Sequence, residues 1–275
     1  MRLLVVADLH GAYQRLGSLL QADDVLISLG DHVNVIDYKD LSGLLADAVP
    51  KETINSTLQL IQEERLDEAR AAMAQAAGSV PDLFARIRRA ARTAYFEMSE
   101  AIPCEAHFIY GNVDFPDVLR ASLKNGQTLH EADVLEFEGR RFGLVSGLVP
   151  GPYSFGMPGE VDRKTFAQRL HDIGGCDVLC VHTPPDIESM AYDVTAERDE
   201  KGSADIVYYA DLVRPKLVLF GHIHQPRVAE FTDLKSTAFP VRFVNVGCFR
   251  DTGRVLQIHL PNLETSWLTA DSPAA

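Results

Sequence analysis

Seven residues of the types that bind metal ions occur in five short pieces, each at or just beyond the end of an apolar run. The pieces are Asp8-Leu9-His10, Gly30-Asp31, Gly111-Asn112, His182 and Gly221-His222-Ile223-His224. Carboxylate, imidazole and amide groups are ligands for divalent ions. Each piece alone is common in proteins, and a histidine is often a hydrogen-bonded turn or core residue. Seven residues of ligand type in five ordered pieces nevertheless predict one shared metal site.

The spacing within two of these pieces suggests how they reach a common point. In extended backbone, residues i and i+2 point the same way, so Asp8 with His10, and His222 with His224, are each expected to aim two ligands at one point. The ends of strands in an open α/β sheet are also where ligands usually bind. The other histidines in the chain are expected to be ordinary turn or core residues, and these are His107, His130, His171 and His259.

Short apolar runs predict the strands that must position these side chains. Residues 3–7 form one run, helical spacing of Leu16, Leu19 and Leu20 follows, and residues 25–29 form a second run. This strand, helix and strand unit predicts an α/β fold with a sheet covered on both faces. Further strands are expected at 106–110, 142–146, 178–181, 217–220, 241–246 and 255–258. The last three lie close together, so antiparallel strands are expected to close the C-terminal half.

Two segments lie outside this strand pattern. Residues 40–102 are rich in Ala, Leu, Glu, Gln and Arg, which predicts two or three helices, for instance over 51–77 and 82–100. We expect this helical insertion to pack on the core, cover the site or form a homo-oligomer contact. Residues 147–162 are rich in Gly and Pro and predict a surface loop that could wall a site. The expected organisation is one domain over 1–268 with a flexible tail at 269–275.

Composition excludes several classes of protein. The chain has 275 residues, 46% of them hydrophobic and 24% charged, which is typical of one globular domain. No apolar run is long enough to cross a membrane, and the N-terminal run lacks a signal-peptide cleavage site, so we expect a cytoplasmic protein. The four cysteines form no CxxC pair and are expected to be reduced and structural. The net charge of −13 disfavours binding to long nucleic acid, so any phosphate recognition must be local.

Taken in order, the five pieces resemble the motifs of the calcineurin-like metallophosphoesterase superfamily, namely DxH, GDxx[DN], GN, H and GHxH. Asn34 completes the second motif, and Asn245-Val246-Gly247 resembles a turn that follows in many members. The resemblance implies a sandwich of two mixed β-sheets flanked by helices. It also implies two divalent metal ions, one bound by Asp8, His10 and His224 and the other by Asn112, His182 and His222. Asp31 would bridge the two ions.

Charge counting explains why such a ligand set suits phosphate. Two divalent ions contribute +4, Asp8 and Asp31 contribute −2, and Asn112 with four neutral histidines contributes nothing, so the centre keeps +2. Such a centre could hold a hydroxide and a phosphate oxyanion together, and it could activate the hydroxide for attack on phosphorus. The resemblance implies Asp31, Asn112 and His182 as catalytic residues. Mixed His and carboxylate ligands suit Mn²⁺, Fe²⁺, Co²⁺, Ni²⁺ or Zn²⁺, and we favour Mn²⁺.

The sequence departs from the family pattern after Asn112. Many members have a histidine there that aids the leaving group, whereas this chain has Val113. Members that lack this histidine resemble small phosphodiesterases, so a phosphodiesterase for a small or nucleotide-like substrate is the leading hypothesis. His32 could replace the missing acid, although it could equally be a turn residue, and Asp114 could be structural or could orient a ligand.

Other functions stay open at this stage. A phosphomonoesterase, such as a nucleotide or protein phosphatase, is the main alternative. A nuclease is disfavoured by the negative charge. A non-catalytic scaffold on the same fold is disfavoured because such relatives usually lose metal ligands, and all seven positions are filled here.

Overall fold

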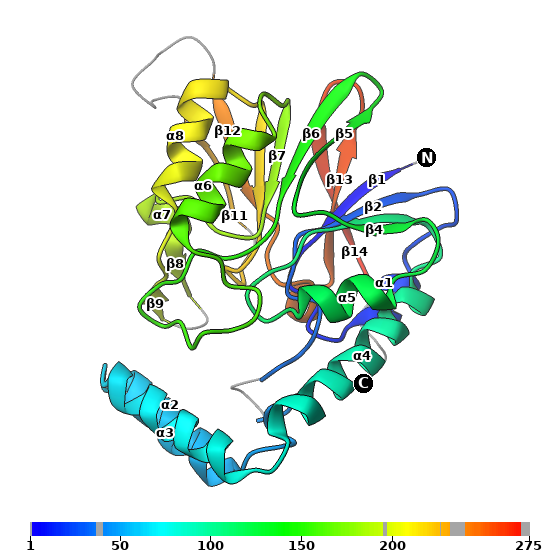
Figure 1. Cartoon of the computed structure of the whole chain (residues 1–275). Helices are drawn as coiled ribbons and strands as arrows, with labels where there is room; N and C mark the ends of the chain where they lie inside the picture. Colours follow the sequence, from blue (N-terminus) through cyan, green and yellow to red (C-terminus); the bar gives the residue numbers. More distant parts are fainter. Residues whose placement is uncertain (1, 37–40, 195–196, 226, 232–239, 271–275) are drawn as a thin grey trace.

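Two six-stranded sheets face each other in the computed structural model, which describes residues 2–36, 41–194, 197–225, 227–231 and 240–270 (Figure 1). The first sheet has the order β14 (Glu264–Thr269), β13 (Arg254–His259), β1 (Leu3–Val6), β2 (Val25–Ser28), β3 (Glu105–Phe108) and β4 (Gln127–Leu129). The second has the order β11 (Arg227–Phe231), β12 (Val241–Asn245), β10 (Leu217–Phe220), β7 (Val178–Val181), β6 (Arg140–Val145) and β5 (Ala132–Phe137). A separate small hairpin pairs β8 (Tyr192–Asp193) with β9 (Arg198–Asp199).

Both sheets are mixed, which confirms the predicted fold class. Strands β1, β2, β3 and β4 run parallel to one another, while β13 pairs antiparallel with β1 and with β14. In the second sheet β6, β7, β10 and β12 are parallel, and the edge strands β5 and β11 are antiparallel. The central strands β1, β2, β7 and β10 are buried over their whole length and almost entirely apolar, because parallel strands in such a sandwich are covered on both faces.

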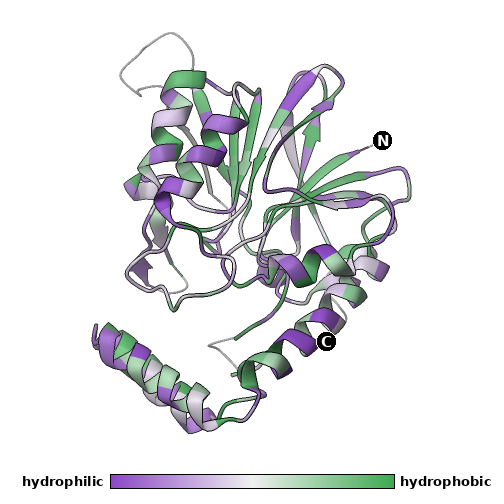
Figure 2. Ribbon diagram, in the orientation of Figure 1, coloured by the Kyte–Doolittle hydropathy of each residue, from purple (hydrophilic) through white to green (hydrophobic). Residues whose placement is uncertain are grey.

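Three apolar layers hold the sheets and helices together. The layer between the sheets contains Leu3, Val5, Phe142 and Cys180, all buried. The outer face of the second sheet is covered by α6 (Arg163–Asp172) and α8 (Ala204–Val213), which bury Phe166, Leu170, Ile206 and Ala210 in this layer. Both helices also carry hydrophilic residues (Figure 2). The outer face of the first sheet is covered by other helices, which are α1 (Tyr13–Gly17), α4 (Leu83–Ala101) and α5 (Pro116–Ser122). Two short helices are α7 (Glu188–Ala191) and α9 (Phe249–Thr252).

The predicted antiparallel closure of the C-terminal half is wrong in detail. Strands β10 and β12 pair in parallel, because the chain between them forms the antiparallel edge strand β11. Strand β13 belongs to the first sheet, where it pairs with β1. Apolar runs predict that strands exist, but the choice of neighbour depends on which faces the helices cover.

The helical insertion consists of three helices. They are α2 (Lys51–Gln62), α3 (Leu66–Ser79) and α4, so the helix expected over 51–77 is two helices. The break lies at Glu64, which has a left-handed φ of 59°. Helices α2 and α3 pack on each other and project from the sheets, whereas α4 runs back to pack against α1 and α5 (Figure 1).

The C-terminal strand extends slightly further than expected. Strand β14 ends at Thr269 and Ala270 is buried, while residues 271–275 of the expected tail lie outside the described residues. Among the helices in the described ranges, none is long and apolar enough to cross a membrane.

Candidate metal centre

Five parallel strands from the two sheets carry the motif residues. Strands β1, β2 and β3 of the first sheet lead into Asp8, Asp31 and Asn112, and β7 and β10 of the second lead into His182 and the His222 turn. Parallel strands that share a direction end at the same edge of their sheet. The fold therefore brings together ends of strands that are far apart in the sequence.

The structure brings all seven predicted ligands together. Ligand atoms lie within 4.8 Å of one another in three groups, which are Asp8, His10 and Asp31; Asp31, His182 and His222; and His10, His224 and Cys248. Asn112 joins the second group, with its Oδ1 3.2 Å from His182 Nε2. Asp31 belongs to two of these groups, as is required of a residue that binds two ions at once. Cys248, which was expected to be structural, adjoins the centre, and all four cysteines are unpaired.

Left-handed backbone, and not extended backbone, aims these side chains. Asp8, His10, Asp31 and His222 have φ values of 54°, 39°, 54° and 68°. Asp8 and His10 share a ligand group as expected, although not through extended backbone, whereas His222 and His224 fall into different groups. Non-glycine residues in this conformation cost about 1–3 kcal/mol each and persist only where the surroundings hold them. Such strain commonly accompanies functional sites.

Hydrogen bonds prepare two imidazoles to bind a cation. His182 Nδ1 donates to the Leu29 carbonyl oxygen at 2.8 Å, and His10 Nδ1 donates to that of Val33 at 3.3 Å. In the neutral rings both Nε2 atoms then carry a lone pair. His10 Nε2 is buried with no hydrogen-bond partner among the described residues. His182 Nε2 faces two acceptor oxygens, Asn112 Oδ1 at 3.2 Å and Asp31 Oδ2 at 3.5 Å. Converging lone pairs of this kind fit a metal ion.

The electrostatics of the protein alone show the same need for a cation. Burial raises the pKa of Asp8 well above its usual value, and the nearby Asp31 carboxylate raises it further. Burial also raises the pKa of Asp31, but His182, His10 and His222 outweigh this and leave it below the usual range. Burial lowers the pKa of His10 to about 4, which keeps its ring neutral at pH 7. Burial lowers the pKa of His182, but the Asp31 carboxylate in turn raises it against this effect. Two buried carboxylates facing imidazoles suit divalent ions.

Asp114 fixes the turns that carry Asp31 and Asn112. Its carboxylate is completely buried and accepts hydrogen bonds from the backbone N–H groups of Asp31, His32 and Gly111, at 2.8, 3.0 and 3.0 Å. It also accepts from the Tyr95 hydroxyl at 3.0 Å. Because one carboxylate holds two motif turns from different strands, Asp114 positions the metal ligands.

His32 is not placed to act as the predicted acid. The residue is completely buried, with Nδ1 3.0 Å from Asp114 Oδ2 and Nε2 3.0 Å from Ser28 Oγ. Its ring also packs edge-on against Phe108. Both ring nitrogens are engaged within the core, so the geometry gives His32 a positioning role through Asp114.

Two residues of the β8–β9 region that the sequence did not suggest lie beside the centre. Glu200 Oε2 is 3.8 Å from His222 Nε2, and Glu200 Oε1 accepts from Arg198 Nε at 2.7 Å. The Arg198 guanidinium lies 3.9 Å from the centroid of the Tyr153 ring. Burial raises the pKa of Glu200, but His222 and Arg198 lower it to about 2, so it is ionised. No motif marks these residues, because only folding places β9 against the His222 turn.

Replacing Glu200 with glutamine should weaken metal binding. The variant keeps the size of the side chain but removes the charge facing His222, and losses of such orienting carboxylates typically cost about 10–100-fold in metal affinity. We therefore expect a comparable increase in the Mn²⁺ concentration needed for half-maximal activity, and in the Kd measured by equilibrium dialysis. Asp199→Asn is the matched control, since Asp199 is an exposed neighbour on β9. Identical Mn²⁺ dependence in both variants would contradict this role.

The Gly- and Pro-rich loop expected at 147–162 lies against the centre. Gly159 N–H donates to the Asn112 carbonyl oxygen at 3.0 Å, and a Cβ on Gly159 would lie 1.8 Å from the Gly111 oxygen, so only glycine fits there. Arg70 of α3 donates to the carbonyl oxygens of Pro152 and Ser154. The loop therefore links the helical insertion to the turn that carries Asn112.

Comparisons with known proteins agree with this arrangement. A family model described as calcineurin-like phosphoesterase matches residues 1–226. No curated protein matches the sequence at a significant level. One solved crystal structure aligns with a TM-score of 0.61 at 13% identity, covering 98% of this chain and 99% of its own.

Two further solved structures are similar. The protein TT1561 of Thermus thermophilus aligns with a TM-score of 0.54 at 12% identity, over 98% of this chain and 99% of its own. A structure described as a novel archaeal phosphodiesterase aligns with a TM-score of 0.40 at 10% identity, over 98% of this chain and 99% of its own. At these identities the likeness concerns the fold alone, and the last carries no argument about substrate.

Proposed function

This chain belongs to the calcineurin-like phosphoesterase family, and from that premise we propose that it hydrolyses a small or nucleotide-like phosphodiester with two divalent metal ions. One observation carries the proposal. Ligand atoms of Asp31, Asn112 and His182 converge, and Asp31 is shared with Asp8 and His10. Such a ligand set suits two ions on either side of one carboxylate.

The ligands divide by position. Asp8, His10 and His224 would hold one ion, Asn112, His182 and His222 the other, and Asp31 both. Bound there, the ions would lower the pKa of a water molecule toward neutrality and offset the negative charge of the phosphoryl group. We propose Mn²⁺ as the ion in the cell, since mixed imidazole and carboxylate ligands suit it. The unpaired cysteines fit a reducing compartment, so we propose a cytoplasmic location.

The surrounding residues orient the ligands and set the local charge. Val113 N–H donates to Asp31 Oδ1 at 3.1 Å, which leaves Oδ2 turned toward His182. The Arg198–Glu200 ion pair is neutral in total, so the excess positive charge of two ions would remain available to phosphate. That local charge compensates for a chain whose net charge of −13 repels polyanions, which favours small substrates over long nucleic acid.

The diester preference rests on the missing acid. Val113 cannot donate a proton, and His32 faces the core, so neither can protonate a leaving group. Esters whose leaving groups need no such help are therefore favoured, and we favour a diester because family members that lack this histidine resemble small phosphodiesterases. The direct test compares bis(p-nitrophenyl) phosphate with p-nitrophenyl phosphate, using chelator-treated protein before and after Mn²⁺ addition. We expect Mn²⁺-dependent hydrolysis and faster turnover of the diester. Faster turnover of the monoester would make the phosphomonoesterase alternative the better description.

Replacing Val113 with histidine should restore proton delivery. Proton transfer by a positioned side chain typically contributes about 10²–10⁴-fold, so we expect a gain of about tenfold or more for a diester with a poor leaving group, such as diphenyl phosphate. The rate for bis(p-nitrophenyl) phosphate should change little, because its leaving group needs no proton. Val113→Gln is the control, because glutamine is similar in polarity to histidine but cannot act as an acid. Equal rates for the histidine and glutamine variants would show that water protonates the leaving group.

A further inference from the structure

A second cluster of metal-binding side chains lies at the edge where the two sheets adjoin, outside the ligand groups described above. His107 of β3 and His130, which follows β4, face each other with Nδ1 of the first 3.1 Å from Nε2 of the second. Each ring also meets a carboxylate through its other nitrogen. Glu105 Oε1 lies 3.1 Å from His107 Nε2, and Asp133 Oδ2 of β5 lies 3.0 Å from His130 Nδ1.

Counting protons over this chain of four residues shows that a cation is needed. A carboxylate can only accept, so His107 Nε2 and His130 Nδ1 must each carry a hydrogen to form their contacts. A neutral imidazole carries only one hydrogen. His107 Nδ1 and His130 Nε2 then both present lone pairs to each other at 3.1 Å. This arrangement is stable only if a shared proton or a metal ion lies between the two nitrogens.

Two features of the geometry fit a metal ion. Zinc–nitrogen bonds of about 2.0–2.1 Å at a tetrahedral angle place two ring nitrogens about 3.3–3.4 Å apart, close to the separation found here. Metal-binding histidines almost always donate their other N–H to a carboxylate or carbonyl, as both rings do here. Burial lowers the pKa of His107, which favours a neutral ring with a lone pair at Nδ1.

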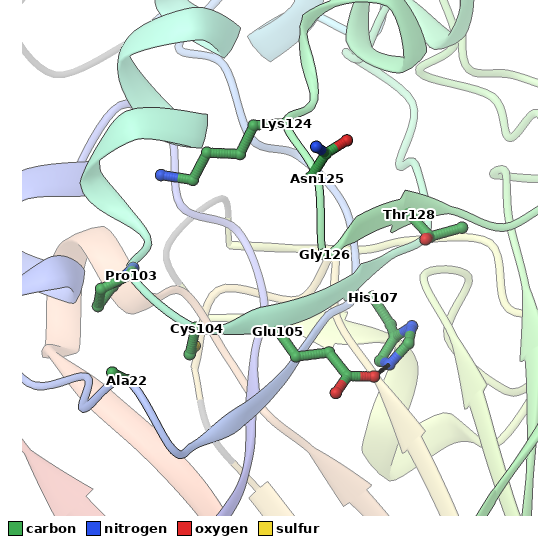
Figure 3. Close-up of a pocket in the computed structure, with 9 residues that line it drawn as sticks. All are labelled: Ala22, Pro103, Cys104, Glu105, His107, Lys124, Asn125, Gly126 and Thr128. Atoms are coloured by element: carbon green, nitrogen blue, oxygen red, sulfur yellow. Dashed lines mark hydrogen bonds and ion pairs between the residues drawn. The ribbon is translucent and has the colours of Figure 1, made fainter.

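The histidine pair lies next to a surface pocket. The two histidines are 8% and 7% exposed. His107 also lines a surface pocket of about 330 Å³ together with Glu105, Lys124 and Thr128 (Figure 3). Figure 3 shows the His107 ring beside Glu105 on the wall of this pocket.

We propose that His107 and His130 form a binding site for a zinc-type divalent ion, separate from the catalytic centre. Imidazole ligands suit Zn²⁺, Cu²⁺, Ni²⁺ and Co²⁺ better than Mg²⁺ or Ca²⁺. The bound ion would tie β3 of one sheet to the start of β5 in the other through its oriented ligands. Both histidines are buried and hydrogen-bonded, as expected from the sequence, and the proposal adds a ligand role to that position.

Zinc binding by the full-length protein tests the proposal. Chelator-treated protein is dialysed against Zn²⁺ at pH 7.5, and bound zinc is counted per chain. We expect the wild type to bind one more Zn²⁺ than His107→Gln or His130→Gln. The control His171→Gln removes an exposed histidine of α6 and should bind as many as the wild type.

A site-specific measurement makes the result independent of folding in the variants. Nitrogen NMR of ¹⁵N-histidine-labelled wild type should show His107 Nδ1 and His130 Nε2 shifting to metal-bound values on Zn²⁺ addition. Resonances that stay unshifted at saturating Zn²⁺, or equal zinc counts in the wild type and folded His130→Gln, would overturn the proposal and leave a shared proton. Because zinc is counted without substrate, this outcome is independent of whether the catalytic proposal holds.

Discussion

Asp31→Asn is expected to lower kcat/KM for the phosphodiester by about 10²–10³-fold, the scale seen when a single preorganised electrostatic group is removed from an active site. Asparagine keeps the shape of the side chain and can still accept the Val113 N–H through Oδ1. It removes the negative charge common to both ligand groups, one with Asp8 and His10 and the other with His182 and His222. The two ions would then repel each other without a shared anion between them.

Two measurements separate this effect from misfolding. Metal content after dialysis against Mn²⁺ should fall below the wild-type value, while the midpoint of urea unfolding of the metal-free protein should change little. Asp117→Asn is the control, because Asp117 lies on the exposed side of α5, where it pairs with Arg88. If Asp31→Asn keeps its metal and loses less than tenfold in kcat/KM, Asp31 does not bridge the ions.

Asp114→Ala should cause the largest loss of stability, about 3–5 kcal/mol in the free energy of unfolding, as found when one partner of a buried charged pair is removed. The carboxylate accepts hydrogen bonds from three backbone N–H groups, from the Tyr95 hydroxyl and from the His32 ring. All of these donors are buried, and leaving them unpaired adds a desolvation cost. Urea unfolding monitored by circular dichroism measures the change. Activity should fall too, because the Asp31 and Asn112 turns lose their common anchor.

The pH dependence of this loss of stability follows from the direction in which the pKa of Asp114 is shifted. Burial raises the pKa of Asp114, but His32 and the Gly111 N–H lower it below the usual value. The ionised carboxylate therefore contributes fully above the unfolded-state pKa of about 3.9, and this contribution is lost as pH falls through the lower folded-state pKa. The difference between wild type and Asp114→Ala should be constant from about pH 6 to 8 and shrink in acid. The exposed control Asp117→Ala should stay within about 0.5 kcal/mol of wild type. A similarly small effect of Asp114→Ala would show that solvent satisfies these donors.

Local sequence was informative where residue type and order carry the chemistry. Buried parallel strands are apolar throughout, so runs such as residues 3–7 and 25–29 predicted the strands correctly. The seven candidate ligands follow those strands directly, and the carboxyl ends of parallel strands meet at one edge of a sheet. Order along the chain was therefore enough to predict the family and to expect a shared site. The departure at Val113 was also visible, because a missing histidine is a property of the sequence itself.

The tertiary structure decided what depends on contacts between distant segments. From the sequence alone, Asp114 could be structural or could orient a ligand. In the structure its carboxylate accepts hydrogen bonds from the turns after both β2 and β3, so it orients ligands. His32 lies next to Asp31, yet the turn directs its ring into the core. Glu200 reaches His222 from a separate small hairpin, and no spacing rule connects them.

The sequence by itself thus determined which residues are available to bind the ions, since ligand chemistry belongs to the side chains and their order along the strands. Only the tertiary structure decided how those residues are aimed. The left-handed backbone at Asp8, Asp31 and His222 is unfavourable locally and exists because the packed sheets and the buried hydrogen bonds hold it in place. That balance between local strain and distant contacts cannot be read from neighbouring residues alone.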